Sequence, residues 1–133
     1  MKGYWFVRRP ALDGVKCVLT DGGSVLLVRH TYGDRGWDLP GGSVKRRELP
    51  SDAARREMRE ELGVDIAEWV PLGRVLSTMH HRRDTMHCFR AELNGAEITM
   101  DRGELEEVRW FRRGQLPPGL GDHVRRILAR TPG

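Results

Sequence analysis

The first apolar segments of the chain have the pattern of a β-hairpin. Residues 15–20 and 24–29 are mostly apolar, and Asp21-Gly22-Gly23 between them is a turn signal. After a polar loop, Trp37-Asp38-Leu39-Pro40 predicts a short extended piece, which Gly41-Gly42 stops. The chain therefore begins as β-structure that ends at a glycine pair.

Residues 51–62 have the clearest helical pattern in the sequence. Ser51 is the expected N-cap, and Gly63 is expected to end the helix in the left-handed conformation. Apolar residues recur every fourth position and form a stripe for packing, made of Ala54, Met58 and Leu62.

The second half of the chain alternates strand and turn signals and ends in a helical pattern. We expect strands over residues 72–79, 85–93 and 107–111, a turn at Asn94-Gly95, a turn of helix at residues 113–116 and a last helix over residues 121–130. The order of strands, helix, strands and helix predicts an α/β fold with a mixed sheet packed against helices.

Length and charge narrow the class of protein. The 133 residues are enough for one domain, predicted over residues 1–133, and no apolar run is long enough to span a membrane. The net charge is +4, and nearly all of the cations are arginine, whose planar fork suits phosphate groups. Cys17 and Cys88 lie far apart in apolar segments and are expected to be buried free thiols, as in cytoplasmic proteins.

Three glutamates share one face of the predicted helix. Glu57, Glu60 and Glu61 stand at positions i, i+3 and i+4, and repulsion between Glu57 and Glu61 alone destabilises the helix by about 0.2–0.5 kcal/mol. Such a set fits a hard divalent cation, Mg²⁺ or Mn²⁺. The helix by itself leaves open a plain solvated face whose arginines neutralise the glutamates.

The spacing around this helix resembles the signature of the Nudix hydrolases. It reads Gly42, five residues, Glu48, seven residues, Arg56-Glu57-Met58, one residue, Glu60-Glu61, one residue, Gly63-Val64. The likeness continues outside this segment, with a hairpin at residues 15–29, the Trp37–Gly42 segment, and an acidic stretch from Glu104 that ends at Trp110-Phe111. It covers roughly residues 12–130 of the chain.

The resemblance implies a fold, an activity and a metal site. The fold is a three-layer α/β/α sandwich with a mixed β-sheet. The activity is hydrolysis, dependent on Mg²⁺ or Mn²⁺, of a diphosphate bond in a nucleoside diphosphate linked to another moiety. By position, Glu57, Glu60 and Glu61 would bind the metal, with the carbonyl of Gly41 as a further ligand.

Further roles follow from the same resemblance. Arg56 would pair with Glu48 or Glu57 and hold that carboxylate in place. The family often draws one more acidic residue from a later loop, as metal ligand or general base. Glu104 is our candidate for this role, and Glu106 and Glu107 are weaker alternatives.

The segment before the helix departs from the family pattern. The family commonly has Glu-x-Gly-Glu there, whereas this chain has Lys45-Arg46-Arg47-Glu48. Arg47 thus replaces a glycine that eases a turn, and the rim of the site becomes more basic. We expect an altered affinity for substrate or metal rather than loss of activity.

The substrate is less well defined than the chemistry. Arg29, Arg82 and Trp37 are candidates for substrate binding, and ordinary surface or core positions are the alternative for each. The leading substrate is a small phosphorylated nucleotide derivative. The 5′ end of RNA is the alternative, although no additional RNA-binding motif is visible. A ligand sensor without catalysis is a third reading, which the intact acids disfavour, and a homodimer stays open because some family members dimerise.

Overall fold

The computed structural model describes residues 11–31, 36–79 and 82–131, with the backbone alone for residues 11–12, 77–79 and 82. Eight elements follow one another in this part of the chain: β1 (Ala11–Asp21), β2 (Ser24–His30), β3 (Gly41–Ser43), α1 (Pro50–Leu62), β4 (Val70–Met79), β5 (Arg82–Glu92), β6 (Leu105–Arg112) and α2 (Asp122–Leu128). No helix in these ranges has the length and apolar character that crossing a membrane requires.

The six strands form one mixed sheet. Its order is β4-β5-β1-β2-β6, and β3 pairs with β1 outside this path. The β1–β5 pair is parallel, while the other pairs are antiparallel. β1 and β2 are paired only next to their turn, at Thr20–Val25 and Asp21–Ser24, so β3 can pair with the earlier part of β1.

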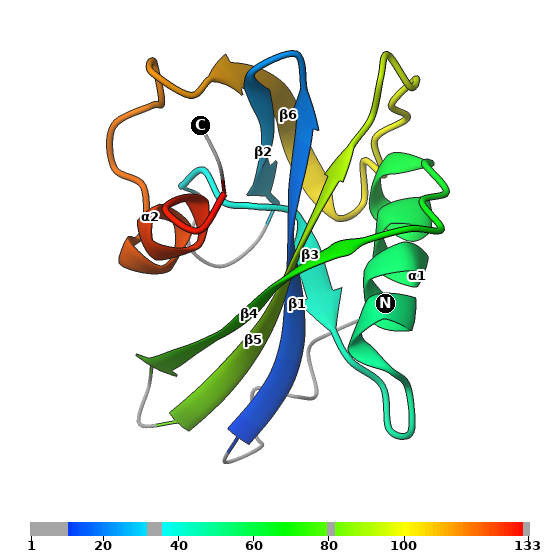
Figure 1. The fold of residues 1–133 in the computed structure, drawn as a ribbon, viewed down its shortest axis with the longest axis vertical. Helices are drawn as coiled ribbons and strands as arrows, with labels where there is room; N and C mark the ends of the chain where they lie inside the picture. Colours follow the sequence, from blue (N-terminus) through cyan, green and yellow to red (C-terminus); the bar gives the residue numbers. More distant parts are fainter. Residues whose placement is uncertain (1–10, 32–35, 80–81, 132–133) are drawn as a thin grey trace.

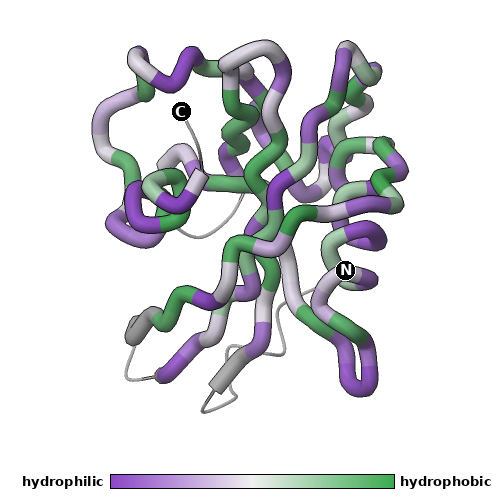
Figure 2. Tube along the Cα trace, in the orientation of Figure 1, coloured by the Kyte–Doolittle hydropathy of each residue, from purple (hydrophilic) through white to green (hydrophobic). Residues whose placement is uncertain are grey.

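The two helices cover opposite faces of this sheet (Figure 1). The core on the α1 side contains Val15, Cys17, Leu19, Leu26, Val28, Ala53, Ala54, Met58, Leu62, Val64, Ala91, Leu93 and Leu105. The core on the α2 side contains Val18, Val25, Leu27, Leu39, Val75, Cys88, Leu120, Val124, Ile127 and Leu128. The strands between the helices are accordingly the most hydrophobic part of the trace (Figure 2). The predicted α/β/α sandwich is confirmed.

Of the two predictions about the ends of α1, the one for the N-terminus is wrong and the one for the C-terminus is correct. Ser51 is not the N-cap, because Pro50 already occupies the first turn and Leu49 is the capping residue, without a side-chain hydrogen bond. Proline suits this place, since its fixed φ is helical and it lacks an N–H that would have no partner there. Gly63 ends the helix with φ 68°, the left-handed conformation predicted for it.

Three predicted elements need correction. Gly41-Gly42 does not stop the chain but begins β3, because glycine lets the backbones approach: a Cβ on Gly41 would lie 1.9 Å from the Val15 carbonyl oxygen. Residues 113–116 form no helix but include a hydrogen-bonded turn, which the Gln115 amide closes by donating to the Arg112 carbonyl at 2.8 Å. The last helix is shorter than predicted and spans Asp122–Leu128.

Candidate functional site

Arg56 of α1 is the centre of the predicted site. Its Nε and Nη2 donate to the two carboxylate oxygens of Glu48, both at 2.9 Å. Its Nη1 donates to Glu57 Oε2 at 3.1 Å and to Glu60 Oε1 at 2.9 Å, and Nη2 also donates to the Ser43 carbonyl at 2.9 Å. One guanidinium therefore orders three carboxylates and ties α1 to β3. The predicted pairing with Glu48 or Glu57 occurs with both.

The segment between β3 and α1 is a compact turn. Glu48 accepts from the Lys45 amide at 2.9 Å, and the Glu48 amide donates to the Lys45 carbonyl at 3.0 Å. Hydrogen bonds from Arg56 hold the pKa of Glu48 below its ordinary value, and the same contact raises the pKa of Arg56. Arg47 has φ 65°, in the left-handed region that favours glycine.

Glu57 and Glu61 are directed into the protein rather than toward solvent. They are only 3% and 2% exposed, whereas the Glu60 side chain is 40% exposed. The Glu57 carboxylate lies directly on Gly42, where a Cβ would be 2.2 Å from its carboxyl carbon. Burial raises the pKa of the Cys17 thiol, and the nearby charge of Glu61 raises it further. Both carboxylates therefore face β1 and β3 beneath the helix.

The three later acids separate into two groups. Glu104 is buried, and its segment docks on the end of α1 through the Thr99 amide bonded to the Leu62 carbonyl and the Asp101 amide bonded to the Glu61 carbonyl, at 2.8 and 2.9 Å. Glu106 and Glu107 are instead paired with Arg29, at 3.2 and 3.4 Å. The geometry thus favours Glu104 as the additional acid of the site.

The chain matches a known protein family over nearly its whole length. The family model of the NUDIX domain matches residues 10–131. The chain belongs to the Nudix family.

Its relatives differ in length and in the activities their names give. A Bacillus subtilis (strain 168) protein with the provisional name 8-oxo-dGTP diphosphatase is 32% identical over 103 residues, which are 75% of this chain and 65% of that protein. The NAD-capped RNA hydrolase NudC of Escherichia coli O1:K1 / APEC is 33% identical over 112 residues, 81% of this chain and 42% of that protein. The chain thus spans less than two thirds of these relatives.

A solved structure shows the same fold. The MutT NUDIX hydrolase from Burkholderia pseudomallei superposes with a TM-score of 0.83, over 92% of this chain and 98% of that one, at 24% identity. At this identity the likeness supports the fold alone, which agrees with the layers described above.

The α1 face fits the divalent cation that the Nudix family implies. Glu57 and Glu61 are buried carboxylates, and hard cations prefer oxygen donors of this kind. Within residues 11–31, 36–79 and 82–131, no three acidic, histidine or cysteine side chains form a ready-made metal cluster. Arg56 still binds oxygens of Glu57 and Glu60. The buried carboxylates therefore suit a hard divalent cation as far as their donor atoms are concerned.

Two of the three predicted substrate-binding residues lie away from these carboxylates. The Arg29 guanidinium stacks on Trp37 at 5.5 Å, and Trp37 packs edge-on against Phe111 in the α2-side core. Trp37 therefore lies on the α2 side of the sheet, whereas the Glu57 carboxylate lies against Gly42 on the α1 side. The backbone of Arg82 starts β5, but its side chain lies outside the described residues.

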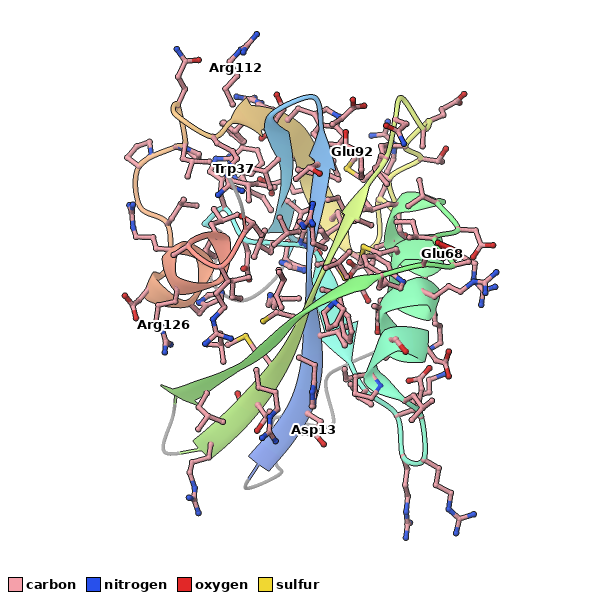
Figure 3. All side chains as sticks on the ribbon, viewed as in Figure 1. Asp13, Trp37, Glu68, Glu92, Arg112 and Arg126 are labelled. Atoms are coloured by element: carbon pink, nitrogen blue, oxygen red, sulfur yellow. The ribbon has the colours of Figure 1, made fainter. Side chains whose placement is uncertain are left out.

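A pocket of about 550 Å³ lies at the other end of the Nudix helix. It is lined by residues 63–68 and by parts of 92–97, and Glu68 and Glu92 mark it in Figure 3. Glu92 is bound by the Thr20 hydroxyl at 2.6 Å and the Gly22 amide at 3.0 Å. Glu92 thus stabilises the β1–β2 turn. Arg56 is not among the residues that line the pocket.

The structure brings together two polar clusters that the sequence did not predict. In the α2 layer, Asp38 accepts from Lys16 at 2.7 Å and lies 2.9 Å from His123 Nε2. Burial alone would raise the pKa of Asp38, but Lys16 and His123 outweigh it and hold this pKa well below the ordinary value. On the α1 face, His87 Nε2 lies 3.6 Å from Asp13 Oδ1.

Proposed function

We propose that this protein is a divalent-metal-dependent hydrolase of the diphosphate bond in a nucleoside diphosphate linked to another moiety. The observation that carries the proposal is the convergence of carboxylates on Arg56: one guanidinium orders Glu48, Glu57 and Glu60, and Glu61 is buried on the same helix. Carboxylates gathered in this way suit a hard divalent cation. The names of the curated relatives, a nucleotide diphosphatase and a capped-RNA hydrolase, support the same class of bond.

Glu57, Glu60 and Glu61 would hold Mg²⁺ or Mn²⁺, and the Gly41 carbonyl is a further candidate ligand. When bound, the ion neutralises phosphate oxygens and activates water. Arg56 orients the acids, and Gly42 leaves room for the Glu57 carboxylate. These residues would act mainly by positioning the reacting groups and by electrostatic stabilisation, which contribute most to the catalysis of phosphoryl transfer.

The hydrolytic step has a simple balance. The oxygen of water bonds to phosphorus, and the bridging P–O bond breaks, so that the leaving group departs with that oxygen. A carboxylate oxygen of Glu104 accepts the proton of the attacking water. Its segment contacts the end of α1, which keeps this acid next to the helix that carries the other glutamates.

A substrate panel tests the proposal. Release of phosphate and nucleotide is measured with Mg²⁺, with Mn²⁺ and with EDTA, on nucleoside triphosphates, nucleotide sugars, dinucleoside polyphosphates, ADP-ribose and 5′-triphosphorylated RNA. We expect turnover that EDTA abolishes, and the product pair identifies the bond that is cut. Absence of turnover throughout, from protein that still binds nucleotides, contradicts the proposal and favours a ligand sensor.

The 5′ end of RNA is a second candidate substrate. Lys45, Arg46 and Arg47 are all exposed at the tip of the β3–α1 turn, and the NudC relatives are named for capped RNA. Contacts to several phosphates make binding strongly salt-dependent. If RNA is the substrate, its KM will rise steeply with salt, and replacing these three cations with alanine will flatten that slope. A mononucleotide substrate predicts neither effect.

We also propose a cytoplasmic location. Cys17 and Cys88 are buried free thiols, and burial raises the pKa of Cys88 to about 11. Thiols kept in this form fit a reducing compartment. Fractionation of cells that produce the full-length protein tests this location, and recovery from an oxidising compartment contradicts it.

A further inference from the structure

One row of residues crosses four strands on the α1 side of the sheet, starting from the carboxylate site. Gly42 of β3 is paired with Val15 of β1, Val15 with His87 of β5, and His87 with Arg74 of β4. The Glu57 carboxylate lies on Gly42, so the row begins at the proposed metal ligands. Neighbouring strands are about 4.8 Å apart, which puts His87 about 10 Å from Gly42 along the sheet.

This row leads from a covered to an open surface. Val15 is 1% exposed beneath α1, the His87 side chain is 21% exposed, and Arg74 at the far end is exposed. In the next row on the same face, Asp13 is paired with Thr85 and Thr85 with Leu76, which is 67% exposed.

Asp13 and His87 are the polar pair in the middle of this surface. His87 Nε2 and Asp13 Oδ1 are 3.6 Å apart, and the Asp13 side chain is 64% exposed. Asp13 lies on the N-terminal part of β1 (Figure 3), two residues before Val15 and therefore on the same face. The pair keeps free hydrogen-bonding capacity on the carboxylate, because a carboxylate offers about four acceptor sites.

We propose that Asp13 and His87 bind the ribose hydroxyls of the substrate's nucleoside, so that the protein prefers ribonucleotides to their 2′-deoxy and 3′-deoxy counterparts. The inference rests on the proposed function, which places the phosphates at the Glu57 end of the row. A sugar ring attached to a phosphate there extends along the sheet toward His87. An acidic side chain that accepts from ribose hydroxyls is a known mode of nucleotide recognition. Exposed Leu76 offers an apolar contact to the base.

The size of the preference follows from the chemistry of the pair. Loss of one hydrogen bond to a charged acceptor weakens binding by about tenfold to a hundredfold. A larger effect is not expected, because Asp13 is exposed and water can replace the missing hydroxyl. We therefore expect a ribose preference of about tenfold to a hundredfold.

Calorimetric binding of matched nucleotides to the full-length protein tests the proposal without requiring turnover. The probes are ADP and GDP with their 2′-deoxy and 3′-deoxy forms, each titrated in the presence of Mg²⁺. We expect the ribose forms to bind at least about tenfold more tightly than one of the deoxy forms. In Asp13→Asn and His87→Ala the ratio falls to about one, mainly through weaker binding of the ribose form, and His87→Asn restores part of it.

A second histidine provides the matched control. The His123 side chain is also 21% exposed and also contacts an aspartate, Asp38, but it lies in the α2 layer. His123→Ala should leave the ribose preference unchanged. Circular dichroism of each variant checks the fold, and exposed Asp13 makes Asp13→Asn the safer of the two test variants.

The outcomes separate this inference from the proposed function. Equal affinity of the wild-type protein for ribose and deoxyribose forms overturns the inference, as does an equal loss for both forms in Asp13→Asn. EDTA-sensitive turnover combined with either of these results leaves the hydrolase proposal standing. A ribose preference without any turnover supports this inference and contradicts the hydrolase proposal.

Discussion

The α1 and α2 layers both bury charged groups against the same sheet, but they balance these charges differently. In the α2 layer, Asp38 lies between Lys16 and His123, so the carboxylate has two cationic or hydrogen-bonding partners. In the α1 layer, within the described residues, the single guanidinium of Arg56 binds three carboxylates.

The difference separates a structural cluster from a functional one. A balanced cluster satisfies its own charges and joins elements, here β1, the Trp37–Pro40 segment and α2. Several carboxylates gathered at one cation repel one another. A ligand of opposite charge stabilises such a cluster, and clusters of this kind concentrate at functional sites. We therefore expect substitutions in the α1 layer to affect turnover and those in the α2 layer to affect stability.

The largest expected effect is on turnover in the α1 layer. Glu60→Gln and Glu61→Gln should each lower kcat at least about a hundredfold while the protein stays folded, because each removes a charged metal ligand or distorts the set. Steady-state kinetics on the best panel substrate, with circular dichroism alongside, measures both. Unchanged turnover in both variants would refute the assignment of this helix face to metal binding.

The next expected effect concerns the additional acid. Glu104→Gln should lower kcat by up to about a hundredfold with little change in KM, because a general base acts in the transition state and not in substrate binding. Glu107→Gln is the control, since Glu107 is engaged with Arg29. If the control loses turnover and Glu104→Gln does not, the base comes from the other segment.

In the α2 layer, Asp38→Asn should reduce stability and spare turnover. The substitution leaves Lys16 and His123 without their carboxylate, and the group is partly exposed, so we expect a loss of about 1–3 kcal/mol in the free energy of unfolding. Urea unfolding measures it. If Asp38→Asn lowers kcat per folded molecule as much as Glu61→Gln does, the assignment of stability to the α2 layer and turnover to the α1 layer is wrong.

The same variant has a defined pH dependence. The pKa of Asp38 is lower in the folded protein than its unfolded value of about 3.9, so its stabilising effect is complete above that value. It is lost as the pH falls from there toward the folded pKa. The difference in unfolding free energy between wild type and Asp38→Asn should therefore shrink as the pH falls below about 4. A difference that grows below that pH would contradict this ion-pair account.

The smallest expected effect is at the turn that departs from the family pattern. Arg47 has φ 65°, so Arg47→Gly should stabilise the protein by up to about 1 kcal/mol, the strain relieved minus the extra chain entropy of glycine. Arg46→Gly is the control: Arg46 is exposed in the same turn, but its φ is not positive. It should be neutral or destabilising in the same urea experiment, and equal stabilisation by both variants would exclude backbone strain as the cause.

Local patterns made part of this account predictable from sequence. The helix and its end at Gly63 depend on residues close together in the chain, whereas the contact of Arg56 with Glu48 was implied by the resemblance to the Nudix family. These predictions are confirmed. The short strand β3 was missed because the glycines that look like a stop are there to let β3 approach β1. Sequence spacing describes neighbours along the chain better than neighbours across a sheet.

The groups that sequence did not bring together meet through long-range pairing. The contacts of Asp38 with Lys16 and His123 need β1, the following loop and α2 in place, and the row from Gly42 to His87 needs the parallel pairing of β1 with β5. Strand alternation does put His87 on the face of Thr85 and Phe89, but which strand lies beside it cannot be read from that pattern.

Manganese binding tests the central claim most directly, because Mn²⁺ accepts the same oxygen ligands as Mg²⁺ and is seen by electron paramagnetic resonance. Free Mn²⁺ is titrated against the wild-type protein, Glu57→Gln, Glu61→Gln and Asp38→Asn. We predict binding by the wild type and by Asp38→Asn, and affinity at least about tenfold weaker in the two glutamate variants. Equal binding by all four proteins, or loss of binding only in Asp38→Asn, would contradict the claim that the clustered carboxylates of the α1 layer form the metal site.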